Sequence, residues 1–339
     1  MNKSFHALDE PALNQYLEAQ SIGVSQIHSI KKFADGQSNP TYLLSAKSGQ
    51  YVLRRKPPGI LLKSAHAIDR EYRVIRALQC TDVPVPRALH LCEDPTIIGS
   101  EFFIMSFIDG KTFWKPELPE LTIDARTACY DNINKTLVAI HSVDIESVGL
   151  SDFGKPGNYF ERQYTRWTEQ YRATETECIP EMDAAIEWLS TNLIDDDGRV
   201  SLTHGDFRID NLMCSHDGTQ VLAVLDWELS TLGHPFADLA YQCALWRMPP
   251  EAALSGLKGI KREELGIPGE EQYVDLYCER MGIAAIEHWN FYRVFSLFRM
   301  AAIVQGVKKR HLEGNASSEN AMGVGALVKP LAAEAAKLL

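Results

Sequence analysis

One stretch of the sequence, residues 202–228, restricts the fold more than any other. A short apolar strand around Leu202 leads into Asp206, and Asn211 follows Asp206 by five residues. A second apolar strand, predicted over residues 221–225, ends at Asp226, fifteen residues after Asn211. Two carboxylates and one amide therefore stand at fixed spacings beside two short strands, a pattern far more specific than one acidic residue in a turn.

These three side chains supply the groups that phosphoryl transfer requires. A carboxylate must orient and deprotonate the attacking hydroxyl, and an amide carbonyl and a second carboxylate must hold magnesium on the phosphates. Asp206 is accordingly the predicted base, and Asn211 and Asp226 are the predicted metal ligands. The step from Asp206 to Asn211 matches the kinase catalytic loop H-R-D-x-x-x-x-N. Any one of these acids alone would be interpreted as a surface turn residue.

Together these segments resemble the aminoglycoside phosphotransferase family, small-molecule kinases with a protein-kinase-like fold. The family's marks are H-G-D-x-x-x-x-N, here residues 204–211, and D-W-E, here residues 226–228. The loop H-G-D-F-R-I-D-N and the earlier V-L-R-R-K-P-P-G, residues 52–59, are similar to the kinase-like domain fused to, or encoded beside, acyl-CoA dehydrogenases. The resemblance extends from about residue 27 to at least residue 246. It implies ATP and Mg²⁺ as cofactors, the roles given above for the three side chains, and a structural role in the loop for His204.

The order of predicted elements gives an α+β fold with two lobes. The first hundred or so residues are rich in strands separated by turn residues, with one helix predicted at 64–79; beyond Asp109 most segments have helical periodicity. We therefore expect a nucleotide-binding lobe and hinge over residues 1–108, with a small antiparallel sheet. A larger, mainly helical catalytic and substrate-binding lobe is expected over residues 109–339. The strands are predicted at 27–33, 41–46, 50–55, 87–92 and 101–107, and the later helices at 123–141, 159–173, 183–193, 237–246, 272–281 and 286–309.

The first lobe of a kinase needs a cation for the α- and β-phosphates, oriented by a glutamate on the next helix. Arg54 occupies the position of the usual lysine, and Glu71 is its expected partner; the alternative for Glu71 is an ordinary surface acid. Arginine presents a planar fork where lysine offers a point charge, so the charge is kept while the phosphate geometry changes. Strand alternation turns Arg55 to the opposite face, where we expect it to be solvated.

The resemblance also implies contacts to ATP that depend mainly on the backbone. Residues 35–39 lie between the first two strands, and Gly36, Ser38 and Asn39 are expected to help cover the phosphates with N–H groups and small side chains. Without the resemblance, this segment would be interpreted as a hairpin turn. Residues 101–108 resemble the hinge strand, where adenine would bond to backbone groups near Ser106 and Ile108.

Residues around the motif refine the prediction. Arg208 stands two residues after Asp206, where protein kinases often carry a lysine that neutralises the transferred phosphate; a solvated arginine is the alternative. Gly205 replaces the arginine that receives a phosphorylated activation loop in many protein kinases, and Trp227-Glu228 replaces Phe-Gly. Both departures favour a constitutive small-molecule kinase. Asp238, near a predicted helix start, is expected either to brace the catalytic loop or to cap its own helix.

Composition and charge exclude several classes of protein. With 34 basic and 45 acidic residues the net charge is −11, and such a chain is poorly suited to grip nucleic acid or an anionic membrane through its overall field. Apolar stretches fall short of the roughly 18 residues needed to span a bilayer. The seven cysteines are widely spaced without a C-x-x-C pair, which favours reduced thiols. We therefore expect a cytoplasmic enzyme without nucleic-acid or membrane partners.

The acceptor is the least constrained part of the prediction. The helix predicted at 159–173 interleaves arginines with aromatic residues, and Arg162 and Arg166 share a face. Such a face suits a carboxylate or a CoA phosphate, or is simply the exposed side of an amphipathic helix. The first hypothesis is therefore ATP-dependent phosphorylation of a hydroxyl on a small metabolite, with a hydroxyacyl-CoA or related hydroxy acid as candidate. The alternatives are an aminoglycoside, sugar or amino-alcohol kinase and, from another class, a nucleotide-binding pseudokinase that regulates an acyl-CoA dehydrogenase. An acyl-CoA dehydrogenase is accordingly the candidate functional partner.

Overall fold

The computed structural model describes residues 8–33, 39–57, 67–314 and 321–339. The chain divides into two compact units. The first joins residues 1–109 to the short segment 222–228, and the second contains residues 110–221 and 229–339. The segment that holds Asp226 thus belongs to the first unit although it comes late in the sequence. None of the helices in the described ranges has the length and apolar character needed to cross a membrane.

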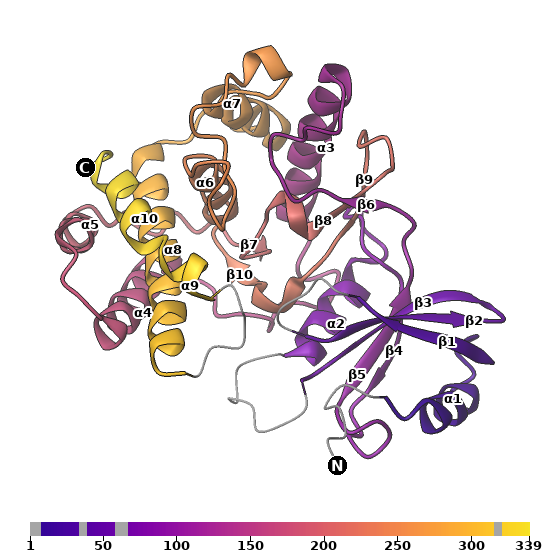
Figure 1. The fold of residues 1–339 in the computed structure, drawn as a ribbon. Helices are drawn as coiled ribbons and strands as arrows, with labels where there is room; N and C mark the ends of the chain where they lie inside the picture. The colour runs from indigo at the N-terminus through magenta and orange to yellow at the C-terminus, as the bar shows by residue number, and fades with distance from the viewer. Residues whose placement is uncertain (1–7, 34–38, 58–66, 315–320) are drawn as a thin grey trace. The chain divides into compact units, whose positions relative to one another are not determined.

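The described part of the first unit is built on an antiparallel sheet with the strand order β1-β2-β3-β5-β4 (Figure 1). The strands are β1 (Ile27–Lys32), β2 (Thr41–Ala46), β3 (Gly49–Arg55), β4 (Ala88–Cys92) and β5 (Phe102–Ser106). The strands predicted here from alternation are therefore confirmed, and β2 matches its predicted bounds at both ends. The order places β3, which carries Arg54, at the centre of the sheet.

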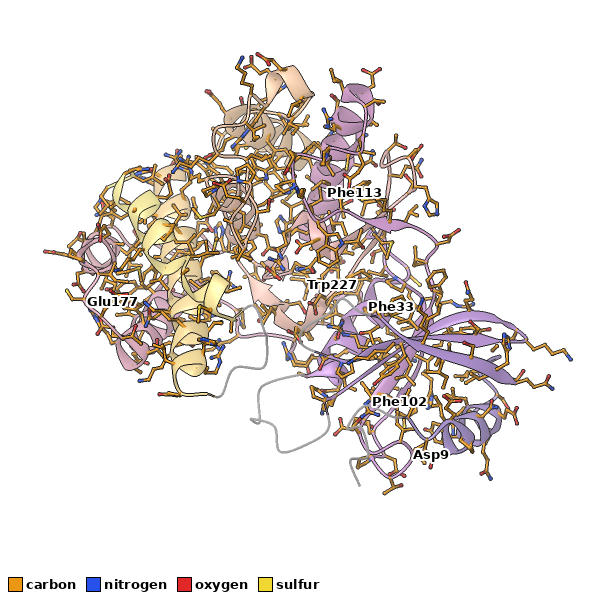
Figure 2. The ribbon with its side chains drawn as sticks, in the orientation of Figure 1. Asp9, Phe33, Phe102, Phe113, Glu177 and Trp227 are labelled. Atoms are coloured by element: carbon orange, nitrogen blue, oxygen red, sulfur yellow. The ribbon has the colours of Figure 1, made fainter. Side chains whose placement is uncertain are left out.

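A helix covers each face of this sheet. α1 (Glu10–Ala19) is capped by the side chain of Asp9, and its Leu17 packs in one core with Phe102 (Figure 2). α2 (Ile68–Leu78) lies on the other face, where the rings of Tyr72 and Phe103 have centroids 5.8 Å apart. The sequence predicts α2, although residues 64–66 of the predicted helix lie outside the described ranges, and it does not predict α1.

Arg55 is buried, so the expectation that it is solvated is wrong. Residues two apart in a strand point the same way, and Arg55 therefore shares a face with Leu53, which packs in the core with α1. Only 2% of Arg55 is exposed, and its Nη1 donates to the Ile98 carbonyl at 3.3 Å. Alternation assigns Arg54 and Arg55 to the correct faces. The expectation of solvation is wrong because the sequence does not predict α1, the helix that covers the face on which Arg55 lies.

The second unit is mainly helical and is organised around the 24-residue helix α8 (Trp289–Leu312) (Figure 1). The predicted helix at 123–141 matches α3 at both ends, and the other helices predicted in this unit differ from the structure by at most three residues at a boundary. The sequence does not predict the last two helices, α9 (Ala321–Gly325) and α10 (Val328–Ala336). α8 packs against α4 (Tyr159–Thr174), α5 (Pro180–Thr191), α6 (Phe236–Leu245), α9 (Ala321–Gly325) and α10 (Val328–Ala336), while α3 (Ile123–His141) packs against α7 (Glu270–Met281).

Short strands hold the ends of the loop that contains Asp206. β7 (Ser201–Thr203) pairs with β10 (Thr231–Gly233), and β6 (Lys111–Thr112) pairs with β8 (Leu212–Cys214), both antiparallel. The loop runs from β7 to β8 and ends in a 3-10 turn over Ile209–Asn211. Further along the chain, all but the first residue of β9 (Val221–Val224) belongs to the segment 222–228 of the first unit. There the Val224 N–H donates to the Pro84 carbonyl at 2.8 Å, which attaches the segment to that unit.

Candidate active site

Five polar side chains of the first unit, related by hydrogen bonds or by charge, form what we call the nucleotide set: Asn39, Arg54, Glu71, Asp226 and Glu228. Arg54 lies at its centre, with Nε donating to Glu71 Oε2 at 2.8 Å and Nη2 donating to Asp226 Oδ1 at 2.5 Å. Asn39 Nδ2 donates to Glu228 Oε2 at 3.1 Å. The predicted contact between Arg54 and Glu71 is therefore present, and the structure adds Asp226 to the same guanidinium.

The backbone at Asp226 explains how this carboxylate comes to face Arg54. Asp226 follows β9 with a left-handed φ of 63°. Aspartate is one of the few residues besides glycine that tolerate this region, and such strained turns gather at functional positions. The next residue, Trp227, supports this turn (Figure 2). Its side chain is fully buried, and its Nε1 donates to the Val224 carbonyl at 3.0 Å.

The nucleotide set holds three carboxylates against one guanidinium. Burial raises the pKa of Glu71 to about 7; Asp226 and Glu228 add to the rise, and Arg54 opposes it. Burial disfavours the charged form of Arg54, but its acidic neighbours outweigh that cost, so its pKa lies above its ordinary value. A divalent cation would relieve the excess of negative charge, and carboxylate oxygens suit Mg²⁺. No three His, Cys, Asp or Glu side chains in the described ranges are grouped to hold an ion, so magnesium here would also need phosphate and water ligands.

Of the other residues expected to contact ATP, two lie outside the described ranges and two already have hydrogen-bond partners within the protein. Gly36 and Ser38 lie outside the described residues. Asn39 is buried, and it connects its loop to Glu228 rather than projecting freely. The Ser106 N–H donates to the Arg87 carbonyl at 2.9 Å. Because the Arg87 carbonyl already accepts the Ser106 N–H, an N–H group for adenine would have to come from another residue of the segment. Ile108, the other residue expected at the adenine, is partly buried.

In the second unit, the predicted base Asp206 and the side chains that contact it or its loop form what we call the loop set: Asp206, Arg208, Asn211, Asp238 and Tyr241. Both carboxylate oxygens of Asp206 accept hydrogen bonds, Oδ2 from Asn211 Nδ2 at 3.0 Å and Oδ1 from the Tyr241 hydroxyl. Asn211 Nδ2 also donates to the Asp206 carbonyl at 2.9 Å, which closes the loop on itself. Arg208 Nε lies 3.4 Å from Asp206 Oδ2, and its Nη2 lies 3.0 Å from Asp210. Arg208 is therefore ion-paired rather than simply solvated.

Asp238 braces the backbone of the loop. Its carboxylate is 1% exposed and accepts the N–H groups of His204 at 2.6 Å and Gly205 at 2.9 Å, one on each oxygen. His141 Nε2 lies 3.5 Å from the same carboxylate. Burial pushes the pKa of Asp238 upward, but His141 and His204 outweigh burial and hold it below its ordinary value. Of the two roles expected for Asp238, the structure supports bracing.

The loop geometry also explains Gly205. Its φ is 82°, and a Cβ there would lie 2.7 Å from the Leu229 carbonyl oxygen, so only glycine fits. The Gly205 carbonyl accepts a hydrogen bond from Arg299 Nη2 of α8 at 3.1 Å. His204 is fully buried, and its Nδ1 accepts the Asp206 N–H at 3.2 Å, which supports the structural role expected for it.

Tyr241 is a site residue that the sequence analysis does not identify, although a signal exists. It follows Asp238 by three residues in α6, so the two side chains share a helix face. If Asp238 braces the loop, the residue one turn later faces the loop as well. Burial, and after it the Asp206 charge, raises the pKa of the Tyr241 phenol well above its ordinary value, so the hydroxyl remains a donor.

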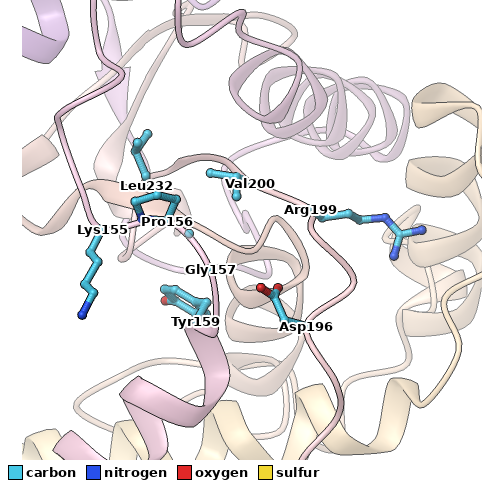
Figure 3. Close-up of a pocket in the computed structure, with 9 residues that line it drawn as sticks. Lys155, Pro156, Gly157, Tyr159, Asp196, Arg199, Val200 and Leu232 are labelled. Carbon is cyan, nitrogen blue, oxygen red and sulfur yellow. The ribbon is translucent and has the colours of Figure 1, made fainter.

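A small hollow in the second unit is separate from the loop set (Figure 3). It is lined by residues 155–157, which precede α4, by Tyr159 at the start of α4, and by residues from the segment 196–200 and from β10. Asp196 accepts the N–H groups of Asn158 at 2.9 Å and Gly198 at 3.3 Å. Arg199 points away from the hollow in Figure 3 and pairs with Asp197. Asp196 and Arg199 are committed to the surrounding turns, and Lys155, the third charged residue of the lining, is exposed, so we assign no ligand to the hollow.

Comparison with protein families identifies the architecture that carries these residues. The model of the phosphotransferase enzyme family matches residues 29–270, well over half of the chain. The chain belongs to this family. The resemblance drawn from residues 204–211 and 226–228 is thereby confirmed, and with it the α+β, protein-kinase-like fold and the class of small-molecule kinase.

Individual relatives are of two kinds. Acyl-CoA dehydrogenase family member 10 of Mus musculus is 47% identical over 332 residues, covering 96% of this chain and 31% of that protein. Acyl-CoA dehydrogenase family member 11 of Homo sapiens is 41% identical over 324 residues, covering 95% and 41%. The chain thus spans less than half the length of these curated relatives.

The second kind are solved structures. A crystal structure from Ralstonia eutropha, assigned to the aminoglycoside phosphotransferases, is 44% identical with a TM-score of 0.89 and covers 98% of both chains. A variant of aminoglycoside phosphotransferase APH(4)-Ia, in a ternary complex with ADP and hygromycin B, has a TM-score of 0.64 and covers 96% of this chain and 98% of that one. Because it is only 15% identical, it shows the shared fold alone.

Proposed function

We propose that the protein transfers the γ-phosphate of ATP to a hydroxyl group of a small metabolite, with Asp206 as the base. The observation that carries this proposal is the Asp206 carboxylate, both oxygens of which are held by the neutral donors Asn211 and Tyr241. A carboxylate fixed in this way can orient a hydroxyl and accept its proton. The family supplies the reaction class, and this geometry supports Asp206 as the residue for its central step.

In the proposed reaction, Asp206 takes the proton of the acceptor hydroxyl as the hydroxyl oxygen attacks the γ-phosphorus of ATP. A bond forms between that oxygen and phosphorus, the bond to the bridging oxygen breaks, and ADP leaves. Arg208 is proposed to neutralise the transferred phosphate, for which it would exchange its present partners Asp206 and Asp210. Asn211 directs its Nδ2 to Asp206, so its Oδ1 is the atom it would offer to a metal.

The nucleotide set is proposed to bind the polyphosphate. Asn211 and Asp226 are the proposed Mg²⁺ ligands; the ion they would hold would neutralise charge on the phosphates. Arg54, oriented by Glu71, would bind the α- and β-phosphates, and these groups would replace its bond to Asp226. The remaining proposed contacts are Gly36, Ser38 and Asn39 over the phosphates and the backbone of Ser106 and Ile108 at the adenine.

The proposed acceptor is a hydroxyacyl-CoA or a related hydroxy acid. The arginines of α4 differ in what they contact: Arg162 donates to backbone carbonyls near the helix start, and Arg172 pairs with two acidic side chains. Arg166 is exposed and lies 5.1 Å from the centroid of the Trp167 ring. Arg166 is therefore the best suited of the three to meet a carboxylate or a CoA phosphate. The names of the curated relatives, acyl-CoA dehydrogenase family members, support an acyl-CoA acceptor and a functional link to such an enzyme.

A panel of acceptors tests this proposal. The protein is incubated with Mg-ATP and hydroxyacyl-CoAs, free hydroxy acids, sugars, amino alcohols and aminoglycosides, and products are identified by mass spectrometry and ³¹P NMR. An Asp206→Asn sample, purified in parallel, accounts for contaminating kinases. We expect phosphorylated hydroxyacyl-CoA with the wild type only. Product from an aminoglycoside, sugar or amino alcohol instead would identify the alternative acceptor class, and no product from any hydroxyl would contradict the enzyme proposal.

One observation favours a second candidate function, a nucleotide-binding pseudokinase that regulates an acyl-CoA dehydrogenase. The bond between Arg54 and Asp226 joins two groups that an active kinase needs for phosphate and metal. The pseudokinase proposal predicts that nucleotide binding changes the rate of acyl-CoA oxidation by the dehydrogenase, and that Asp206→Asn leaves this effect unchanged. The presence of Asp206, Asn211 and Asp226 together favours the enzyme, because a binding module has no need of the base.

A further inference from the structure

We infer that Tyr241 is a positioning residue that fixes the orientation of the Asp206 carboxylate for the reaction. The inference rests on the proposed role of Asp206 as base. Tyr241 lies on α6, is 7% exposed, and donates its hydroxyl to Asp206 Oδ1. No step of the proposed reaction requires a tyrosine to exchange protons or to touch ATP, so its contribution would be geometric.

The argument begins with the two oxygens of Asp206. Asn211 holds Oδ2 from within the loop, and Tyr241 holds Oδ1 from the neighbouring helix. Two donors on two elements define the plane of the carboxylate, whereas one donor would leave it free to rotate about that single bond. Each carboxylate oxygen has about two acceptor positions, so both oxygens can still receive a substrate proton. A catalytic group held in this way starts close to its reactive geometry.

Tyr241 is itself held in place by its surroundings. The Arg299 guanidinium lies 5.8 Å from the centroid of the Tyr241 ring and 5.9 Å from that of Trp167. The same arginine donates to the Gly205 carbonyl, so the ring and the loop have a common support on α8. One turn earlier on α6, Asp238 fixes two amides of the loop. The hydroxyl that reaches Asp206 therefore belongs to a rigid part of the unit.

Tyr241→Phe tests the inference, because it removes only the hydroxyl. We expect kcat to fall by about ten- to a hundred-fold, while KM for Mg-ATP and the Kd of a non-hydrolysable ATP analogue change less than about two-fold. Tyr273→Phe is the matched control. It too removes a buried hydroxyl next to α6, one that donates to Gln242 Oε1 at 2.9 Å, but it does not touch the loop. We expect its kcat to stay within about two-fold of the wild type. If Tyr241→Phe is poorly folded, Tyr241→Met keeps the apolar volume and takes its place.

A double variant separates positioning from mere stability. In the Asp206→Asn background, Tyr241→Phe should reduce residual single-turnover rates by less than about two-fold, because the carboxylate it positions is gone. Equal losses in both backgrounds would indicate a structural role and overturn the inference, as would full kcat in Tyr241→Phe. Turnover that survives Asp206→Asn, or a wild type with no turnover on any acceptor, would instead reject the base assignment and the inference with it.

Discussion

The nucleotide set and the loop set hold their functional groups by different means. In the nucleotide set, one guanidinium binds two carboxylates and a third acid adds to the excess of negative charge. In the loop set, neutral side chains and backbone amides donate the hydrogen bonds to Asp206 and Asp238, and the cation Arg208 lies 3.4 Å from Asp206 as an ion pair. We propose that the crowded charges of the nucleotide set rearrange when phosphate and metal bind, whereas the buried neutral donors of the loop set keep their geometry. The contrast fits a binding role for the first set and an orienting role for the second.

The largest expected effect comes from removing the charge that the loop set positions. Asp206→Asn keeps the shape of the side chain but cannot accept the hydroxyl proton. We expect kcat to fall by at least about 10²-fold with ATP binding retained, measured by ADP release and by calorimetry. Asp210→Asn, which removes the other carboxylate beside Arg208, is the control and should lower kcat by less than about ten-fold. Near-normal turnover in Asp206→Asn would remove the basis for treating the two sets differently.

A smaller effect is expected when the support behind the loop is weakened. Asp238 uses one oxygen for each of two amides, and asparagine has only one oxygen, so Asp238→Asn leaves a buried N–H without an acceptor. We expect the free energy of unfolding to fall by about 1–3 kcal/mol. Misplacement of the loop should lower kcat by about ten-fold. Urea unfolding and steady-state kinetics measure the two effects.

Asp144 offers a matched control for that experiment. Its Oδ1 also accepts two backbone N–H groups, those of Glu146 at 3.1 Å and Ser147 at 3.2 Å, but it is exposed. In Asp144→Asn, water can satisfy whatever the side chain gives up, so stability and kcat should stay close to those of the wild type. Equal losses in both variants would mean that bracing the catalytic loop gives Asp238 no special importance.

The sequence predicts those features of each set that involve residues close together in the chain. Asp206 and Asn211 lie five residues apart in one loop, and alternation along β3 directs Arg54 and Arg55 to opposite faces. It does not foresee α1, where only Leu13 and Leu17 are buried in a ten-residue helix, so the apolar face is too narrow to stand out. That omission is also why the burial of Arg55 is unexpected.

The remaining contacts depend on tertiary structure that no local pattern carries. All ten residues of α6 are buried, so amphipathicity cannot indicate that Asp238 and Tyr241 face the loop. The bond from Arg54 to Asp226 joins residues 172 positions apart, and it depends on the late segment 222–228 joining the first unit. Motif spacing predicts which residues are functional, but it does not say which other side chains hold them.

A variant of Arg54 probes the charged set more gently. Lysine keeps the charge but has one nitrogen, whereas Arg54 uses Nε for Glu71 and Nη2 for Asp226. We expect Arg54→Lys to raise the Kd for Mg-ATP by about five-fold with little change in kcat. Arg55→Lys, on the opposite face of β3, should lower stability and leave the Kd unchanged. A tighter Kd in Arg54→Lys would mean that the wild-type ion pair competes with the nucleotide.

The smallest effect is one of pH, and it reports directly on the crowding of charge in the nucleotide set. Glu71 has a pKa of about 7 in the folded protein, above its ordinary value of 4.5, chiefly because it is buried. Between these values the folded state keeps a proton that the unfolded chain releases, so stability should decline as pH rises from about 4.5 to about 7. Glu71→Gln cannot titrate and should lack this part of the decline.

Urea midpoints at pH 5, 6 and 7 measure this difference between the wild type and Glu71→Gln. Glu101→Gln is the control, because Glu101 pairs with Lys56 at a partly exposed position and should follow the wild-type profile. A Glu71→Gln profile parallel to the wild type would mean that Arg54 keeps Glu71 ionised across the whole range. The nucleotide set would then be a fixed ion pair like many others, and its readiness to rearrange around phosphate and metal would have to come from Asp226 and Glu228 alone.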